Sequence, residues 1–152
     1  HISKYAGKSE SLPNWDVAAG AAHLVGGHAY PDFTETDWQM MARRVFREQE
    51  DGSIVADCDP KISELFDKVL PNEGAPNYWE GFMALSGRPV MCIWGKLSNI
   101  LAEETLTTMR ERMPAMHVIE LENRGHVPLL TEEPSLEGLG QFLGAVSLER
   151  TA

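Results

Sequence analysis

Apolar residues recur at helical spacing through the first half of the chain. Over residues 38–46 they fall at positions i, i+3, i+4, i+7 and i+8, which is typical of a helix with one buried face. Residues 62–69 carry a second such stripe, and the alanine-rich stretch Trp15–Val25 indicates a third helix. We expect Thr36 and Gln39 to form a capping box at the start of the helix over residues 38–46.

The pattern changes near residue 88, where continuous apolar runs replace the helical stripes. One run covers Val90–Trp94, and a run of this length fits a strand that is covered on both faces. His117–Leu121 predicts a second strand, and helical stripes over residues 102–113 and 136–146 follow the two strands. Strand, helix and strand in this order indicate parallel pairing with a right-handed crossover.

Two parallel strands alone do not make a stable sheet, because both would be edges with unpaired backbone groups. Their apolar faces would also need more cover than the second half of the chain can supply. We therefore infer that further strands exist, either on another chain or in a segment that precedes His1. The chain begins with His instead of Met, which suggests that its N-terminus has been lost, cut or not included.

Composition narrows the class of protein. The chain has 152 residues, of which 43% are hydrophobic and 24% charged, and this is ordinary for one soluble domain with a core. A net charge of -10 argues against binding to nucleic acid, which depends on clustered Lys and Arg. No apolar run approaches the roughly 20 residues of a membrane helix, so we expect no membrane partner. Cys58 and Cys92 are too few for a disulfide framework and favour a reducing, cytoplasmic setting.

Two polar side chains follow the two predicted strands. Asn99 lies in the loop after Val90–Trp94, and Gly125–His126 lies in the loop after His117–Leu121. Parallel strands would bring an orienting group and a proton-carrying imidazole to the same edge of the sheet. We predict that His126 is the catalytic general base and that Asn99 orients its ring. The alternatives are a histidine that caps a surface turn and an ordinary loop asparagine.

Other polar and aromatic residues offer weaker candidates. His23 and His28 lie five apart without nearby Cys or carboxylate ligands, so we expect no metal site. Residues 71–87 are expected to form a loop, in which Tyr78 and Trp79 could line a substrate cleft. The chain contains no G-x-S-x-G elbow, so it offers the histidine no serine nucleophile of its own.

In residues 88–145 the chain resembles the α/β-hydrolase fold family. The run R-P-V-M-C-I-W-G at residues 88–95, followed by L-S-N-I-L at 97–101, is similar to the family's penultimate core strand and acid-bearing loop. The run N-R-G-H-V-P at residues 123–128 is similar to its histidine loop. Glu132–Glu133–Pro134 and the helix after them look like its C-terminal helix, and the first half of the chain looks like its cap.

The resemblance implies an α/β class with a partial α/β-hydrolase fold. Residues 1–87 would be a helical cap or lid, and residues 88–152 a strand–helix–strand–helix C-terminal part of the core. The family's catalytic triad runs Ser, acid, His along the chain, so the nucleophile would lie in a missing N-terminal half of the core. His126 aligns with the general base, and Asn99 falls where the family usually places an aspartate.

The reaction that the resemblance implies is hydrolysis of an ester, a lactone or a related bond. The substrate would be a small apolar molecule, and the chemistry needs no cofactor. The partners expected are that substrate and the missing half of the core. The chain alone is a fragment in this interpretation, and we expect it to be inactive.

Two other interpretations stay open. A non-catalytic relative would keep the cleft as a small-molecule binding module and would have lost the triad, which the missing elbow and Asn99 both favour. An unrelated acidic helical protein that assembles through its apolar surface would contain few strands. At position 99 itself, four explanations are compatible with the sequence: a natural replacement with low activity, an engineered change, an acid supplied by the missing half, and an alignment in which Asn99 does not correspond to the acid.

Overall fold

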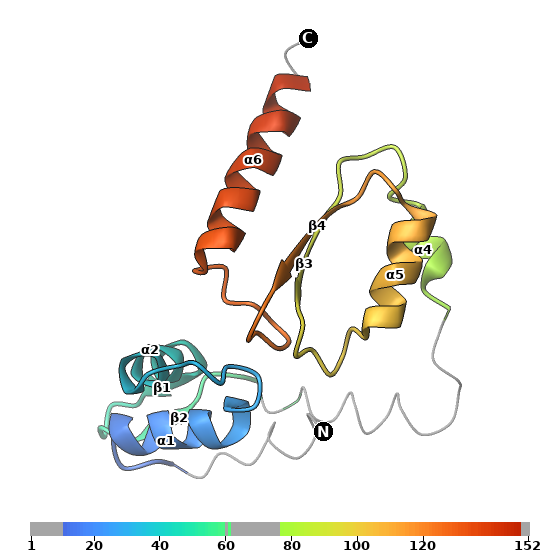
Figure 1. Cartoon of the computed structure of the whole chain (residues 1–152). Helices are drawn as coiled ribbons and strands as arrows, with labels where there is room; N and C mark the ends of the chain where they lie inside the picture. The colour runs from blue at the N-terminus through green and yellow to red at the C-terminus, as the bar shows by residue number, and fades with distance from the viewer. Residues whose placement is uncertain (1–10, 60, 62–76, 150–152) are drawn as a thin grey trace. The chain divides into compact units, whose positions relative to one another are not determined.

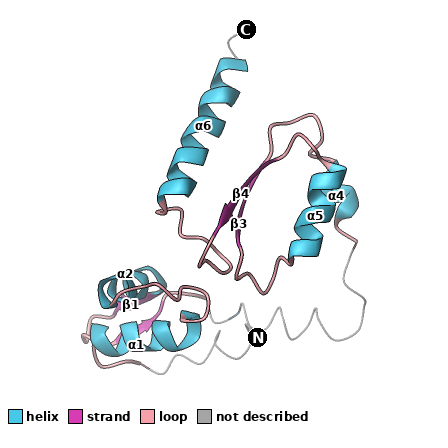
Figure 2. Ribbon diagram, in the orientation of Figure 1, coloured by secondary structure: helices cyan, strands magenta, loops and turns pink. Residues whose placement is uncertain are grey.

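The computed structural model describes residues 11–59, 61 and 77–149 of the chain. These residues form two compact units, one from residues 11–27 and 32–61 (without 60), the other from residues 28–31 and 77–149. Each unit contains helices and a two-stranded sheet (Figures 1 and 2). The division into a cap up to residue 87 and a core after it stays a prediction. In the structure, residues 28–31 and 77–87 lie with the second unit.

Two of the predicted helices form the centre of the first unit. They are α1 (Trp15–Gly26) and α2 (Glu35–Val45), and they pack against each other. Trp38 lies at their contact, stacked on the His23 ring at 4.8 Å between centroids and edge-on to Phe33 at 5.1 Å. Small side chains bring the helices close, since the other buried residues of the pair are alanines: Ala18, Ala19 and Ala42.

The capping box of α2 uses different residues from those predicted. The N-cap is Thr34, whose hydroxyl oxygen accepts from the Asp37 backbone N–H at 3.3 Å. The Asp37 carboxylate accepts in return from the Thr34 backbone N–H at 2.8 Å. The prediction of Thr36 and Gln39 was wrong because the backbone turns helical two residues earlier, at Glu35. The Gln39 amide instead donates to Asp16 of α1.

A short hairpin follows α2, where only helices and loops were expected. Strand β1 (Phe46–Glu48) pairs antiparallel with β2 (Ile54–Ala56). The predicted turn at Asp51–Gly52 is confirmed: Gly52 has φ +80° and the Asp51 carboxylate accepts from the Ser53 N–H at 2.9 Å. Phe46 was predicted as the last apolar residue of the helix, but the helix ends at Val45 and Phe46 is the first residue of β1. The helix predicted over residues 62–69 lies outside the described residues.

The second unit is a parallel strand pair between two helices. Strand β3 (Met91–Gly95) pairs in parallel with β4 (His117–Leu121), in register from the first residue of each to the last, as predicted. The predicted helices are α5 (Glu103–Arg112) and α6 (Glu133–Glu149), one on either side of the pair (Figure 2). Part of the predicted loop is helical, because α4 covers Trp79–Met83.

The alternation of strand residues assigns one face to each helix. Trp94, Leu106, Met113 and Met116 form a buried cluster on the α5 side, with Cys92 and Val118 packed against it. Burial there raises the pKa of the Cys92 thiol. On the α6 side, a Cβ on Gly138 would collide with Ile119, so the glycine lets the helix approach β4 closely.

The revised capping box gives a direct test. Thr34→Ala removes the hydroxyl that satisfies the Asp37 N–H, and we expect it to lower the free energy of unfolding by about 1 kcal/mol. Thr36→Ala is the matched control, because a residue inside the first turn should change that free energy by less than about 0.5 kcal/mol. Urea unfolding of the 152-residue chain measures both. If Thr36→Ala lowered the free energy of unfolding more than Thr34→Ala does, the result would favour Thr36 as the N-cap, as the sequence predicted.

Candidate active site

The loops that carry Asn99 and His126 leave the same edge of the sheet. Strand β3 ends at Gly95 and β4 at Leu121, and the parallel register places these two residues opposite each other. Beyond the strands, the Lys96 N–H donates to the Leu121 carbonyl at 3.0 Å, and the Leu97 N–H donates to the Arg124 carbonyl at 2.8 Å. The two loops are therefore joined through their backbones before either candidate residue is reached.

Gly95 is where the two loops approach most closely. A Cβ at this position would overlap the Arg124 carbonyl oxygen and would lie 2.5 Å from that of Gly125. No side chain fits in that space without moving backbone atoms. The glycine that ends the apolar run is thus required by the packing of the histidine loop against β3.

Asn99 lies in a tight turn that is braced from inside. The Ser98 hydroxyl oxygen accepts from the Ile100 N–H at 3.3 Å and from the Leu101 N–H at 3.0 Å. The indole N–H of the buried Trp94 donates to the Leu101 carbonyl at 2.8 Å, which ties the turn to the core. Asn99 itself is exposed. These bonds fix the backbone on both sides of its side chain.

His126 is exposed at the tip of a loop whose neighbours are buried. Gly125 is buried and its N–H donates to the Ala29 carbonyl at 2.7 Å, while the Val127 carbonyl accepts from the Tyr30 hydroxyl at 2.5 Å. Within the described part of the chain, no hydrogen bond joins the Asn99 side chain to His126. Their pairing in catalysis stays a prediction, supported by the shared edge of the sheet.

Glu132 organises the return of this loop into α6. Its carboxylate pairs with the Arg124 guanidinium at 2.9 Å, and the two side chains are only 9% and 16% exposed. The same carboxylate accepts from the backbone N–H groups of Leu129, at 3.3 Å, and Thr131, at 3.1 Å. Burial acts to raise the pKa of Glu132, but the backbone hydrogen bonds and Arg124 outweigh it, and the pKa lies below its ordinary value.

Tyr78 and Trp79 lie at the other end of α5 from the Asn99 loop. The Arg112 guanidinium, in the last residue of α5, stacks over the Trp79 ring at 4.3 Å. The Asn99 loop leads into the first turn of the same helix, about 15 Å away along its axis. Tyr78 is 74% exposed. The structure does not bring these aromatics next to His126, and their contact with substrate stays a prediction.

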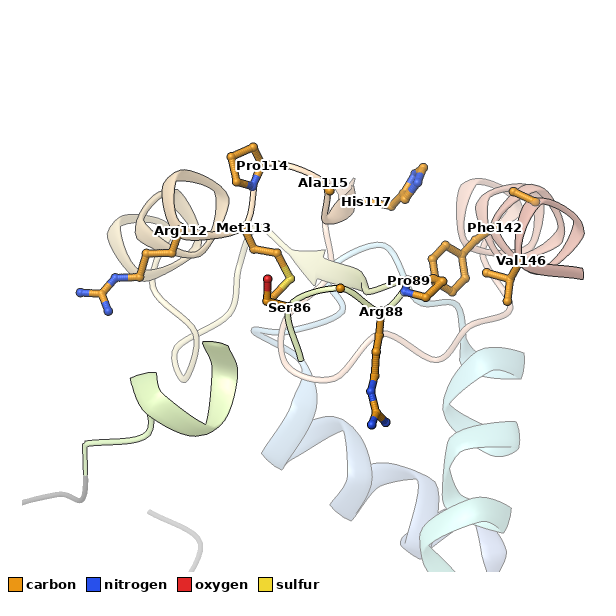
Figure 3. A pocket seen from close by; sticks show the side chains of 12 residues that line it. Ser86, Arg88, Pro89, Arg112, Met113, Pro114, Ala115, His117, Phe142 and Val146 are labelled. Carbon is orange, nitrogen blue, oxygen red and sulfur yellow. The ribbon is translucent and has the colours of Figure 1, made fainter. Parts of the chain in front are cut away.

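A cavity of about 470 Å³ opens at the opposite edge of the sheet from His126. Its lining comes from the residues before β3, the start of β4 and the facing sides of α5 and α6, and includes Arg88, Arg112, His117 and Phe142. Figure 3 shows the side chains of Arg88 and Arg112 extending in different directions. The charged side chains do not point toward one another, so the cavity does not have the converging polar groups of a catalytic site.

Metal and membrane features are absent from the described ranges. No three His, Cys, Asp or Glu side chains gather there as ligands of one ion would. No helix in those ranges has the length and apolar character needed to cross a bilayer.

Sequence reasoning missed the residues that hold the histidine loop. Arg124 and Glu132 were read only as neighbours of the loop and of the last helix, although opposite charges eight residues apart across a turn could have suggested a pair. Nothing in the sequence pointed to Ala29 and Tyr30, because the bond from Tyr30 to Val127 spans 97 residues.

Known structures share this fold. An α/β hydrolase from Novosphingobium aromaticivorans has a TM-score of 0.84 and 32% identity, and the match covers 94% of this chain and 50% of that one. E-2-(acetamidomethylene)succinate hydrolase has a TM-score of 0.67 and 15% identity, with 91% and 48% covered. An esterase of Mycobacterium tuberculosis has a TM-score of 0.62 and 15% identity, with 96% and 45% covered. No protein-family model and no curated protein matches the sequence.

These likenesses confirm the class of fold that the motifs predicted. The chain has an α/β fold that corresponds to part of the α/β-hydrolase fold. The chain spans about half the length of each of the solved hydrolases and esterases above.

The pairing of Arg124 with Glu132 predicts a specific pH dependence. Because the folded-state pKa of Glu132 is lowered, its stabilising contribution is complete above the unfolded-state pKa of about 4.3 and is lost as the pH falls through the folded-state value. Glu132→Gln removes the negative charge that pairs with the largely buried Arg124 guanidinium, so we expect a loss of about 3 kcal/mol in the free energy of unfolding at pH 7. The gap between this variant and the unchanged chain should narrow below about pH 4.

Urea unfolding at pH 7 and at pH 3 measures that gap. Glu133→Gln is the matched control, because Glu133 is the exposed neighbour at the start of α6 and its loss should cost less than about 1 kcal/mol. A gap between Glu132→Gln and the unchanged chain that stays constant with pH would contradict a lowered pKa at Glu132.

Proposed function

We propose that this chain supplies the general-base histidine of a serine-dependent α/β hydrolase. The substrate class would be an ester, a lactone or a related acyl compound of a small apolar molecule. One observation carries the proposal: the His126 loop and the Asn99 loop leave neighbouring parallel strands and are joined by the hydrogen bond from Leu97 to Arg124. This is the edge at which the family places its histidine and its acid.

In this mechanism the imidazole of His126 moves one proton in each half of the reaction. It takes the proton of a serine hydroxyl as the oxygen attacks the substrate carbonyl, and gives it to the departing alkoxide. A water molecule, deprotonated by the same ring, then cleaves the acyl-serine bond and returns the serine to its free state. Exposure of His126 on the described chain is compatible with contact to groups from another segment.

We propose that the serine and its oxyanion hole belong to a polypeptide segment outside these 152 residues. Three observations support this. The sequence has no G-x-S-x-G elbow, the match covers about half of each solved hydrolase, and the second unit has only β3 and β4 among its described strands. A parallel pair with both outer edges unpaired gains stability from further strands.

The substrate class is supported by apolar side chains at the same edge of the sheet. Each of the two loops exposes two large aliphatic residues: Leu97, Ile100, Val127 and Leu130 are 42%, 62%, 53% and 44% exposed. Apolar side chains around a few polar groups are usual in small-molecule sites. These four aliphatic residues are closer to His126 along the sequence than Tyr78 and Trp79 are. The role of Tyr78 and Trp79 as substrate contacts remains a separate proposal. The assignment of residues 1–87 as a helical cap likewise remains a proposal.

Asn99 would act as an uncharged substitute for the acid. Its amide oxygen can accept a hydrogen bond from the ring of His126 and so orient it, but it cannot stabilise the charge of an imidazolium. We also propose a reducing, cytoplasmic setting, supported by Cys58 and Cys92, both of which are free thiols.

A second candidate function is binding without turnover. The observation that favours it is the exposed Asn99, which brings no charge to the site and has no hydrogen bond to His126 in the described chain. A relative of this kind would keep the apolar edge and would hold a small ligand there.

The assignment of His126 is tested by its removal. The polypeptide extended on its N-terminal side to include the serine elbow should hydrolyse a short-chain aryl ester, while the 152-residue chain alone should not. In the extended polypeptide His126→Ala should reduce kcat to near background, a loss of about 10³-fold or more, because no other group takes the serine proton. The measurement is release of the aryl alcohol, followed by absorbance.

His117→Ala is the matched control, because His117 is an exposed histidine at the first residue of β4 and lies at the other end of the strand. It should leave kcat unchanged. Full activity in His126→Ala would end the assignment, and ligand binding without hydrolysis in the extended polypeptide would favour the second candidate.

Position 99 gives a prediction of opposite sign. If Asn99 occupies the acid position, Asn99→Asp restores the carboxylate there, and we expect kcat of the extended polypeptide to rise by between about 10-fold and about 10⁴-fold. Asn14→Asp is the control for one added negative charge, since it lies at the N-cap of α1, where Asn and Asp serve equally. Equal kcat values for Asn99→Asp and the unchanged polypeptide would remove Asn99 from the site.

A further inference from the structure

The segment His28–Pro31 belongs to the second unit although its sequence neighbours belong to the first. It connects α1, which ends at Gly26, to α2, which begins at Glu35, and yet it packs with residues 77–149. Ala29 and Tyr30 are each only 7% exposed. A connecting loop with two buried residues is held by specific contacts, and here those contacts are with the histidine loop.

The contacts flank His126 on both sides. On one side the Gly125 N–H donates to the Ala29 carbonyl at 2.7 Å. On the other side the Tyr30 hydroxyl donates to the Val127 carbonyl at 2.5 Å. Gly125 is pressed against the segment, because a Cβ on it would lie 2.5 Å from the Ala29 Cβ. Two consecutive residues of the segment thus hold the peptide groups before and after one exposed imidazole.

The surroundings keep the Tyr30 hydroxyl protonated and able to donate. Burial raises the pKa of this phenol, the Glu132 carboxylate raises it further, and Arg124 acts in the opposite direction. The hydroxyl therefore stays a donor through the neutral pH range. A hydrogen bond from a buried hydroxyl is lost only if the loop or the segment moves.

We propose that Tyr30 is a positioning residue for His126, which acts with the Ala29 carbonyl to hold the imidazole at the edge where the nucleophile would meet it. The role in catalysis rests on the proposed function, whereas the positioning of the loop does not. The segment is covalently continuous with α1 and α2, and its link to the histidine loop consists of these two hydrogen bonds.

The first test needs no substitution. In the full 152-residue chain, amide hydrogen exchange of Gly125 should be at least about tenfold slower than that of Asn99, an exposed loop residue whose N–H donates no hydrogen bond in the described chain. Nuclear magnetic resonance resolves both amides. Exchange of Gly125 as fast as that of Asn99 would overturn the proposal, because the bond to Ala29 would then not hold the loop.

The second test removes one oxygen atom. Tyr30→Phe keeps the ring and deletes the bond to Val127, so exchange of the Gly125 amide should become about fivefold faster, as expected for one neutral hydrogen bond. The ring signals of His126 should broaden or shift at the same time. Tyr78→Phe makes the same chemical change at an exposed site and should alter neither. Unchanged His126 signals in a folded Tyr30→Phe chain would overturn the proposal. If the circular dichroism spectrum shows that Tyr30→Phe does not fold, the proposal is decided by the exchange rate of the Gly125 amide in the unchanged chain.

Kinetic measurements distinguish the positioning role of Tyr30 from the proposed hydrolase function. In the extended polypeptide, Tyr30→Phe should lower kcat about tenfold through misplacement of the imidazole and leave KM within about twofold. An extended polypeptide without hydrolytic activity would overturn the proposed function and leave the exchange result standing. If the extended polypeptide is active and Tyr30→Phe leaves its kcat unchanged, the positioning role of Tyr30 in catalysis is overturned. The role of His126 as general base would not be affected by that result.

Discussion

The candidate site depends on the backbone of Arg124. Its carbonyl accepts the hydrogen bond from Leu97 that joins the two loops, and the same carbonyl occupies the space that a side chain on Gly95 would need. Its guanidinium pairs with Glu132, which holds the start of α6. One residue therefore fixes the distance between the strands' ends, the course of the histidine loop and the entry into the last helix. A shift of Arg124 would displace Asn99 and His126 relative to each other, whatever their own side chains did.

Much of the fold was predictable because its signals are local. The apolar run at Val90–Trp94 and the stripe of α5 follow from side-chain periodicity alone, and the strand–helix–strand order implies the parallel pairing that the structure has. The missed elements are those in which tertiary contacts decide. The hairpin of β1 and β2 has three residues in each strand, and the buried Ile54 pairs with Leu12 from a distant segment. Such short strands carry no period that a sequence can display.

The candidate site was predictable only in part, for a related reason. His126 and Asn99 stand out because glycine, a small polar residue and a strand end lie together in the sequence. The residues that hold them do not stand out, since Tyr30 is an ordinary aromatic in a loop between two helices. Its value lies in the pairing with Val127, and no local pattern encodes a partner 97 residues away. A candidate residue can be predicted from a motif, whereas the contacts that support it must be seen in three dimensions.

The discontinuous second unit also has a consequence for how the chain acquires its structure. Ala29 and Tyr30 leave the ribosome long before Gly125 and Val127 exist, so α1 and α2 can fold while the segment between them still lacks its partners. The histidine loop is completed only after a long stretch of chain has closed on itself, and that closure is entropically costly and slow. A piece of the protein that started at Asn77 would leave the Gly125 N–H without its acceptor. The unit that carries the imidazole is therefore assembled from two segments that are far apart in the sequence, and it should be among the last parts of this chain to become ordered.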